Sequence, residues 1–180
     1  MLSAMLLCGL MLEFHLDEIE VKKEPTKFTV PDLEVGTVPE PFNKISPVFK
    51  KSISVFGIPV LATADFDAAK HRHVAAVLAE YLDNDEDGKP DNPKVVEAMA
   101  SRAMAMILFS SEREMERLDR SGAELYDFRY LQGQFESETL PRGEFDATIE
   151  EVLHLVTMGY CEAYPRVFGT LPGTELADCL

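Results

Sequence analysis

Cysteine is scarce in this chain of 180 residues, which contains only Cys8, Cys161 and Cys179. Three cysteines do not make the disulfide framework of a small secreted scaffold, and their spacing does not fit a four-ligand zinc knuckle. A Cys161–Cys179 bridge is possible in a secreted protein, and three free thiols are the alternative. The sequence also lacks a glycine-rich phosphate loop, a Gly-x-Ser-x-Gly elbow and a Cys-x-x-Cys pair, so the sites that these motifs build are not indicated.

Basic residues are also few. The chain has 17 Lys and Arg against 32 Asp and Glu, a formal net charge of −15 and a pI near 4.6. A field of this sign repels phosphate backbones and anionic lipid surfaces, so we expect no nucleic-acid partner. The charge suits cations or basic partners, although it is equally consistent with a surface that is simply soluble.

The only candidate targeting segment is too short for a membrane span, which takes about 20 apolar residues. It covers residues 1–12, MLSAMLLCGLML, and has about the length of a signal-peptide core, but it lacks a basic start and a clear Ala-x-Ala site. It predicts either a signal or a buried apolar terminus. The remainder, 13–180, is expected to form one domain, because 46% of the sequence is hydrophobic and the length suits a single core.

Two stretches predict extended structure. Residues 22–47 carry five prolines among charged residues, which blocks helix and predicts an extended arm around a core built elsewhere. The β-branched, apolar segment 52–63 predicts one or two strands, and the aromatic-rich segment 125–135 is also expected to be extended. The apolar run 103–109 fits either a buried strand or a helix, since periodicity does not separate the two.

Capping residues followed by apolar residues at helical spacing predict several helices. Their expected ranges are 65 or 67 to about 82, 94 to about 100, 110 or 111 to about 120, 147 to about 158, and a start at 175. Gly159 is expected to end the fourth helix. One face of the first helix collects His71, Val74, Leu78 and Tyr81. Strands and helices together predict an α+β fold with a small sheet packed against several helices.

The clearest chemical feature is the sequence DNDEDGKPD at residues 83–91. Asp83, Asp85 and Asp87 alternate with other residues, a glycine follows, and Asp91 lies three residues beyond that glycine. Calcium needs six to eight hard oxygen ligands, and alternating aspartates with a turn-permitting glycine wrap a loop around one ion. So much negative charge in so short a loop is repulsive without a cation. The spacing predicts a calcium loop, with a solvated acidic turn as the alternative.

This spacing resembles the first half of an EF-hand loop and the aspartate-rich calcium repeats of thrombospondin type 3. The EF-hand resemblance implies a bidentate glutamate at the twelfth position, where this chain has Lys94. Glu97 can take its place only if the following helix folds back. We therefore expect modest calcium affinity, which suits compartments where calcium is abundant. For this reason we favour a secreted or extracellular protein over a cytoplasmic one.

A second candidate metal site lies on the helix expected to start at residue 147. Its core face is predicted at Ile149, Val152, Leu153 and Val156. Glu150, Glu151 and His154 share another sector, because successive helical residues turn by about 100°. A carboxylate and an imidazole one turn apart can hold a metal ion. The alternative is acidic residues that complement the helix dipole beside a packed histidine.

The sequence Glu150-Glu151-x-x-His154 resembles the His-Glu-x-x-His helix of the zincin metallopeptidases. The resemblance implies a zincin-like fold, zinc held by Glu150 and His154, and Glu151 as the general base that deprotonates a metal-bound water. Glu150 replaces the first histidine of the family pattern. A third ligand is needed, and the candidates are Glu162, Tyr164, His71 and His73.

Residues 81–88 and 150–169 also resemble a family of uncharacterised secreted proteins. This resemblance implies that relatives continue past residue 180, so that the third zinc ligand can lie beyond this chain. Two functions follow from the sequence. The first is a metal-dependent hydrolase, of the peptidase type, acting on a peptide or protein substrate. The second is a non-enzymatic, calcium-stabilised binding or structural domain.

Overall fold

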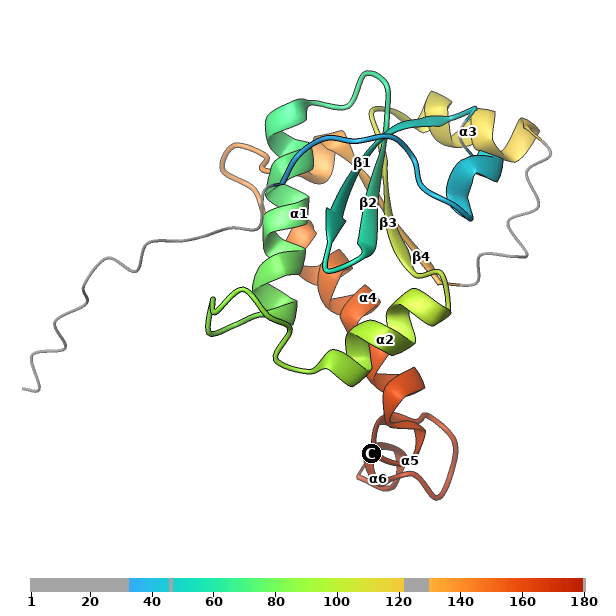
Figure 1. The fold of residues 1–180 in the computed structure, drawn as a ribbon. Coiled ribbons are helices and arrows are strands. Elements are labelled where there is room, and N and C mark those ends of the chain that lie inside the picture. Colours follow the sequence, from blue (N-terminus) through green and yellow to red (C-terminus); the bar gives the residue numbers. More distant parts are fainter. Residues whose placement is uncertain (1–32, 46, 122–129, 180) are drawn as a thin grey trace, which may run out of the picture.

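A computed structural model describes residues 33–45, 47–121 and 130–179. These residues form a four-stranded mixed sheet with helices packed against it (Figure 1). The predicted α+β fold class is confirmed. The apolar segment 1–12 and the first part of the proline-rich arm lie outside the described residues. Within them, no helix has both the length and the apolar content that crossing a membrane requires.

The sheet has the strand order β1-β2-β3-β4. β1 (Phe49–Val55) and β2 (Ile58–Thr63) form an antiparallel hairpin, and β3 (Ala105–Phe109) and β4 (Leu131–Phe135) extend the sheet parallel to β2. Every residue of β2 and β3 is buried, as expected for central strands covered on both faces. The ambiguous run 103–109 therefore contains a strand.

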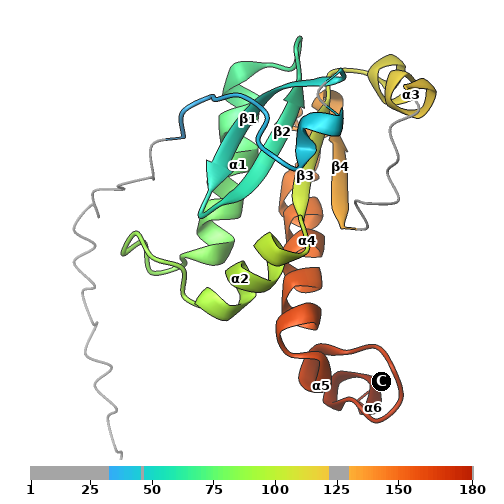
Figure 2. The ribbon, with the colours of Figure 1, turned by 45° about the vertical axis from the view of Figure 1, so that its right-hand side comes forward.

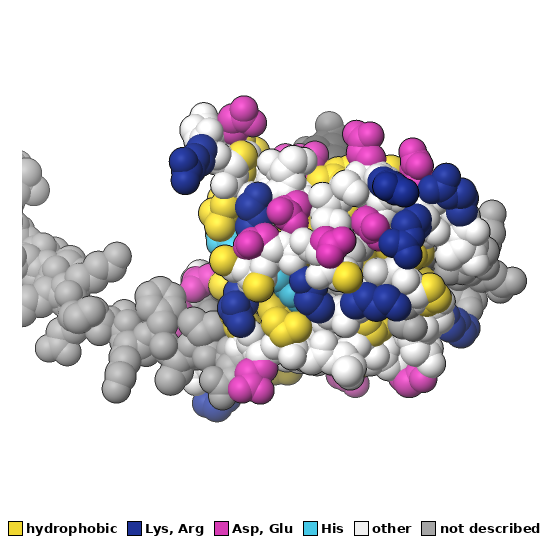
Figure 3. Space-filling model, turned by 90° about the horizontal axis from the view of Figure 1, so that it is seen from above, with side chains coloured by type: hydrophobic (Ala, Val, Ile, Leu, Met, Phe, Trp, Pro, Cys, Tyr) yellow, Lys and Arg dark blue, Asp and Glu magenta, His cyan; other side chains and the backbone are white. Residues whose placement is uncertain are grey.

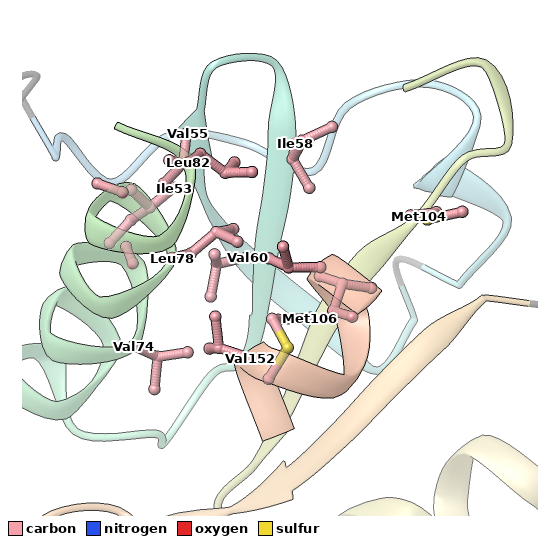
Figure 4. Packing of buried hydrophobic residues seen from close by; sticks show 14 of the residues in the cluster. Ile53, Val55, Ile58, Val60, Val74, Leu78, Leu82, Met104, Met106 and Val152 are labelled. Carbon is pink, nitrogen blue, oxygen red and sulfur yellow. The ribbon is translucent and has the colours of Figure 1, made fainter. Parts of the chain in front are cut away.

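Three helices cover one face of the sheet: α1 (Ala68–Leu82), α2 (Pro93–Ser101) and α4 (Thr148–Ala163). Their buried apolar side chains and those of the sheet form the larger core. Figure 4 shows α1, β2 and α4 meeting in this core, where Val60 and Val152 lie on facing elements. Helices α1 and α2 fix the ends of the loop at residues 83–91, and α4 itself carries Glu150 and His154.

Helix α1 begins at a side-chain cap, as predicted. The Oδ1 atom of Asp67 accepts hydrogen bonds from the N–H groups of Ala69 and Lys70, both at 2.9 Å. The bond from Lys70 in particular lowers the pKa of Asp67, so the cap is charged at neutral pH. The predicted inward face is confirmed at three buried positions and one half-buried position: His71, Val74, Leu78 and Tyr81.

The opposite face of the sheet is covered by residues 38–45 of the arm and by α3 (Glu112–Arg120). The arm touches β1 through a bridge between Gly36 and Ser52, and it continues into a short 3-10 helix, η1 (Phe42–Ile45). Figure 2 shows it crossing β1 and β2 toward β3. The arm therefore wraps around one edge of the sheet and supplies part of a second, smaller core.

The C-terminal part of the chain projects from the sheet. After β4 come η3 (Glu136–Glu138) and α4, and both ribbon views show the far end of α4 extending beyond the sheet (Figures 1 and 2). It carries α5 (Pro165–Phe168) and α6 (Glu175–Asp178). The rings of Tyr160 and Phe168 lie 5.1 Å apart and help to hold this projecting part together.

Two predictions for α4 are wrong. The helix passes through Gly159 and continues to Ala163, because Gly159 is buried against α2, where a Cβ would lie 2.6 Å from Cγ of Met99. Glycine serves close helix packing here and does not end the helix. The core face is also displaced, since Ile149 and Leu153 are 49% and 46% exposed. Packing against both α1 and α2 buries a different set: Thr148, Val152, Leu155, Val156, Gly159 and Ala163.

Candidate metal centre

The aspartate loop (residues 83–91) joins α1 to α2 at the end of the molecule opposite the carboxyl ends of the parallel strands (Figure 1). The N–H of Asp83 donates to the Ala79 carbonyl and that of Asp91 to the Leu82 carbonyl, both at 2.8 Å. These bonds fix both ends of the loop to the last turn of α1. At the other end of the molecule, Lys and Arg side chains lie among the acidic ones (Figure 3).

Asp83 is the anchor of the loop. The residue is only 6% exposed, and its two carboxylate oxygens accept hydrogen bonds from the N–H groups of Asp87 at 3.1 Å and Gly88 at 2.9 Å. Gly88 has φ +84°, a left-handed conformation that glycine adopts without strain. The glycine of the motif therefore lets the chain turn so that two backbone donors face one aspartate.

Three of the four predicted ligands come together in this loop. One carboxylate oxygen from each of Asp83, Asp85 and Asp91 lies within 4.8 Å of the others. In the described part of the chain, no other group of three acidic, histidine or cysteine side chains meets this criterion. Hard carboxylate oxygens at this spacing suit a divalent cation such as calcium or magnesium. The Asn84 N–H also donates to Asp91 at 3.0 Å and holds the far carboxylate over the loop.

Asp87 is the predicted ligand that does not join this group. Its carboxylate accepts hydrogen bonds from the N–H of Lys89 at 2.9 Å and from the Lys89 ammonium at 3.1 Å. The hydrogen bond between the Lys89 ammonium and Asp87, together with the charges of Asp87, Asp85 and Asp83, raises the pKa of Lys89. The lysine thus acts as an internal cation for the loop, and Asp87 can ligate a metal only after leaving it.

Two further positions of the loop region bear on the ligand set. Lys94, at the twelfth position, lies 4.3 Å above the ring of Tyr164 in a cation–π contact, and Glu97 is exposed on α2 outside the carboxylate group. Glu86 was not predicted as a ligand, yet its Oε2 atom is buried without a hydrogen-bond partner among the described residues. Glu86 is the fourth residue of the loop, a position from which the EF-hand pattern takes no ligand, so spacing alone does not point to it.

The second candidate site is an exposed pair on α4. The Nε2 atom of His154 lies 3.7 Å from Oε1 of Glu150, and both side chains are about three-fifths exposed. Glu151 points elsewhere, since its carboxylate accepts a hydrogen bond from the Gln132 amide on β4. The helical spacing brings Glu150 and His154 together as expected. In the described ranges no third candidate ligand joins them, and zinc binding here stays a prediction.

The two histidines considered as third ligands have other partners. His71 is fully buried, and its Nε2–H donates to the Val60 carbonyl at 2.8 Å. His73 Nε2 lies 2.6 Å from Asp146 Oδ2, which ties α1 to the start of α4. Burial opposes the charge of Asp146, but hydrogen bonds from Thr148, His73 and the backbone of Leu140 outweigh it and lower the pKa of Asp146. Both histidines therefore have structural contacts.

The other two candidates are also engaged. Glu162 lies 2.8 Å from the Arg102 guanidinium and accepts a hydrogen bond from the Tyr130 hydroxyl at 2.5 Å. The Tyr164 hydroxyl donates to Asn92 at 3.1 Å. The possible bridge between the last two cysteines is not formed: Cys161 and Cys179 are free thiols.

Comparison with known proteins assigns no family. No family model, no curated protein and no solved structure matches the chain.

Proposed function

We propose that this protein is a calcium-binding domain in which the aspartate loop holds one ion between α1 and α2. The observation that carries the proposal is the convergence of Asp83, Asp85 and Asp91 within 4.8 Å around a turn that backbone N–H groups already hold in shape. A cation removes the repulsion between these carboxylates, and a loop held in shape loses little entropy on binding.

Calcium fits this loop better than magnesium. Magnesium keeps several waters and is usually bound through one or two carboxylates, whereas calcium accepts six to eight oxygens in a flexible arrangement. The loop offers three convergent carboxylates, and Asp87 can add a fourth by leaving Lys89. With Lys94 turned to Tyr164, no twelfth-position carboxylate completes the set, so modest affinity and an extracellular, calcium-rich setting suit the site.

The ion is proposed to stabilise the domain and to order the start of α2. Its proposed ligands run from Asp83, the C-cap of α1, to Asp91, which directly precedes Asn92, the N-cap of α2. An ion bound there links two helices that pack against the same core. The hydrolase hypothesis at Glu150, Glu151 and His154 stays a separate prediction, since an exposed pair is not a complete zinc site.

The test is thermal unfolding of the purified chain in EGTA, in calcium and in magnesium. A ligand that binds only the folded state adds about 2.7 kcal/mol at a hundredfold excess over Kd, or about 5–10 °C in Tm for a chain of this size. The double variant Asp85→Asn/Asp87→Asn should lose this increment. The exposed pair Glu80→Gln/Glu175→Gln makes the same charge change outside the loop and should keep it. An unchanged calcium response in the loop variant contradicts the assignment.

A further inference from the structure

A pocket lies between the N-terminal arm and the sheet, away from the aspartate loop and sharing no residue with it. It has a volume of about 270 Å³, and we call it the arm pocket. The residues that define it are Glu34, Pro39, Glu40, Ser52, Ser54 and Pro59. Ser52 and Ser54 belong to β1 and Pro59 to β2, so the hairpin forms one wall, and residues 34–42 form the other as they cross it (Figure 2).

The charged side chains that line the arm pocket are all acidic. Glu34 and Glu40 are both exposed, no Lys, Arg or His lines the pocket, and neither glutamate has a basic partner in the described ranges. Glu40 accepts a hydrogen bond from the neutral Asn43 amide. The hydroxyls of Ser52 and Ser54 have no hydrogen-bond partner among residues 33–45, 47–121 and 130–179. The pocket thus offers two carboxylates and two free hydroxyls to a ligand rich in donors.

The remaining walls are flat and apolar. Pro39, Pro41 and Pro59 line the pocket together with Phe42 and Met104. A guanidinium group matches this combination, because its planar faces stack on flat apolar surfaces while its five N–H donors reach carboxylate and hydroxyl oxygens. An ammonium group matches it less well, being a compact and strongly hydrated charge.

The edge of β1 that carries Ser52 and Ser54 favours a polypeptide as the carrier of that group, because among the described residues only Gly36 pairs with this edge. The N–H and C=O of Ser52 face outward, since both bond to Gly36 of the arm. In a strand, residues two apart direct their backbone groups to the same side, so those of Ser54 face the same edge. No described residue pairs with them there. An extended segment can pair with this edge beside the pocket.

We propose that the arm pocket binds an arginine side chain of an extended partner polypeptide, whose backbone pairs with β1 at Ser54. The net charge of −15 attracts such a basic partner from a distance. This inference does not depend on calcium binding, because the arm pocket and the aspartate loop have no residue in common.

The experiment is a ¹⁵N–¹H NMR titration of the full chain with the blocked peptide acetyl-Val-Arg-Val-amide. Two matched peptides replace arginine with citrulline, its neutral isostere, or with lysine. We expect saturable shifts centred on the amides of Ser54, Gly57 and Ala103, with the citrulline peptide at least about tenfold weaker, the loss that one charge-assisted hydrogen bond explains. Equal binding of the citrulline or lysine peptide, or no saturable shift, overturns the proposal.

Two sets of variants localise the binding. Glu34→Gln/Glu40→Gln should weaken the arginine peptide by about tenfold or more, whereas Glu80→Gln/Glu175→Gln, with the same charge change on exposed residues, should weaken it less than about twofold. Ser54→Leu fills the pocket from an exposed strand position and should abolish binding, with circular dichroism confirming the fold. An equal effect of the two double variants shows long-range charge attraction alone and rejects the pocket.

Discussion

Asp83 and Asp85 belong to the same carboxylate group, but the calcium-free loop uses them differently. Asp85 is exposed, and its one weak contact, Oδ1 to the Asp87 N–H at 3.3 Å, can be kept by an asparagine. Asp85→Asn also removes a charge that repels its neighbours. In EGTA we therefore expect the free energy of unfolding to stay equal or to rise by up to about 1 kcal/mol. If the loop binds calcium as proposed, the wild type should gain about 2.7 kcal/mol at a hundredfold excess of calcium over Kd, and Asp85→Asn should lose most of that gain.

The order of stability of wild type and Asp85→Asn should thus reverse when calcium is added. Asp83→Asn should behave otherwise, because an amide has one acceptor oxygen where the carboxylate serves the N–H groups of both Asp87 and Gly88. Without calcium the variant should lose about 1.5–3 kcal/mol, and in calcium it should lose more, because Asp83 is also one of the proposed ligands. Urea unfolding followed by circular dichroism, in EGTA and in calcium, measures all three proteins. If Asp85→Asn destabilises the calcium-free protein as much as Asp83→Asn does, the roles assigned here are wrong.

Four other measurements follow from the structure. Burial lowers the pKa of His71 below its ordinary 6.5, so on acidification the unfolded chain binds a proton at a higher pH than the folded chain. The stability that this difference contributes is complete above pH 6.5 and falls as the pH drops below it. His71→Gln should flatten this pH dependence of the free energy of unfolding, measured by urea unfolding between pH 5 and 8. Gly159→Ala gains about 1 kcal/mol of helix propensity, but the added methyl group overpacks the contact with α2 at a cost of about 1–3 kcal/mol. Thermal unfolding should therefore show a net loss of stability of up to about 2 kcal/mol. A variant more stable than the wild type would contradict the packing argument. Lys89→Gln should tighten calcium binding by up to about fivefold in calorimetry, because Asp87 no longer has to leave an exposed ion-pair partner. Equal or weaker binding speaks against the internal-cation role. If α4 binds zinc, elemental analysis should find the metal lost in His154→Ala and kept in Glu151→Gln, and both variants should lose peptide hydrolysis. A wild-type protein without stoichiometric zinc excludes the site.

The parts of the fold that could be predicted are those decided locally. Asp67 caps α1 through bonds to residues two and three positions away, and Pro93 stands at the first turn of α2, where a missing N–H costs nothing. The end of α4 was predicted wrongly at Gly159 because local rules associate glycine with helix ends. Here the glycine serves a tertiary contact, since it makes room for α2. Ile149 and Leu153 were placed inward for their apolarity, but which sector of α4 is buried depends on two neighbouring helices.

The candidate sites, too, could be predicted only where local sequence decides them. Alternating aspartates and a glycine are a local pattern, and the convergence of Asp83 and Asp85 with Asp91 agrees with it. The pairing of Asp87 with Lys89 is a competition between two short-range partners that spacing alone does not decide. The helical period placed Glu150 beside His154, but a third zinc ligand depends on contacts between elements far apart in the sequence, which a period does not report.

Lys94 stands at the twelfth loop position, where an EF-hand has a bidentate glutamate, and here it makes contacts of another kind. Lys94 lies over the ring of Tyr164, the residue that ends α4, and the hydroxyl of the same tyrosine bonds to Asn92, the N-cap of α2. A glutamate at this position would bring a carboxylate toward the negative face of the ring and lose the cation–π contact. The lysine thus fastens the start of α2 to α4. Since Asn92 directly follows Asp91, an ion that draws Asp91 inward pulls on this same junction and, through Tyr164, on the projecting end of α4.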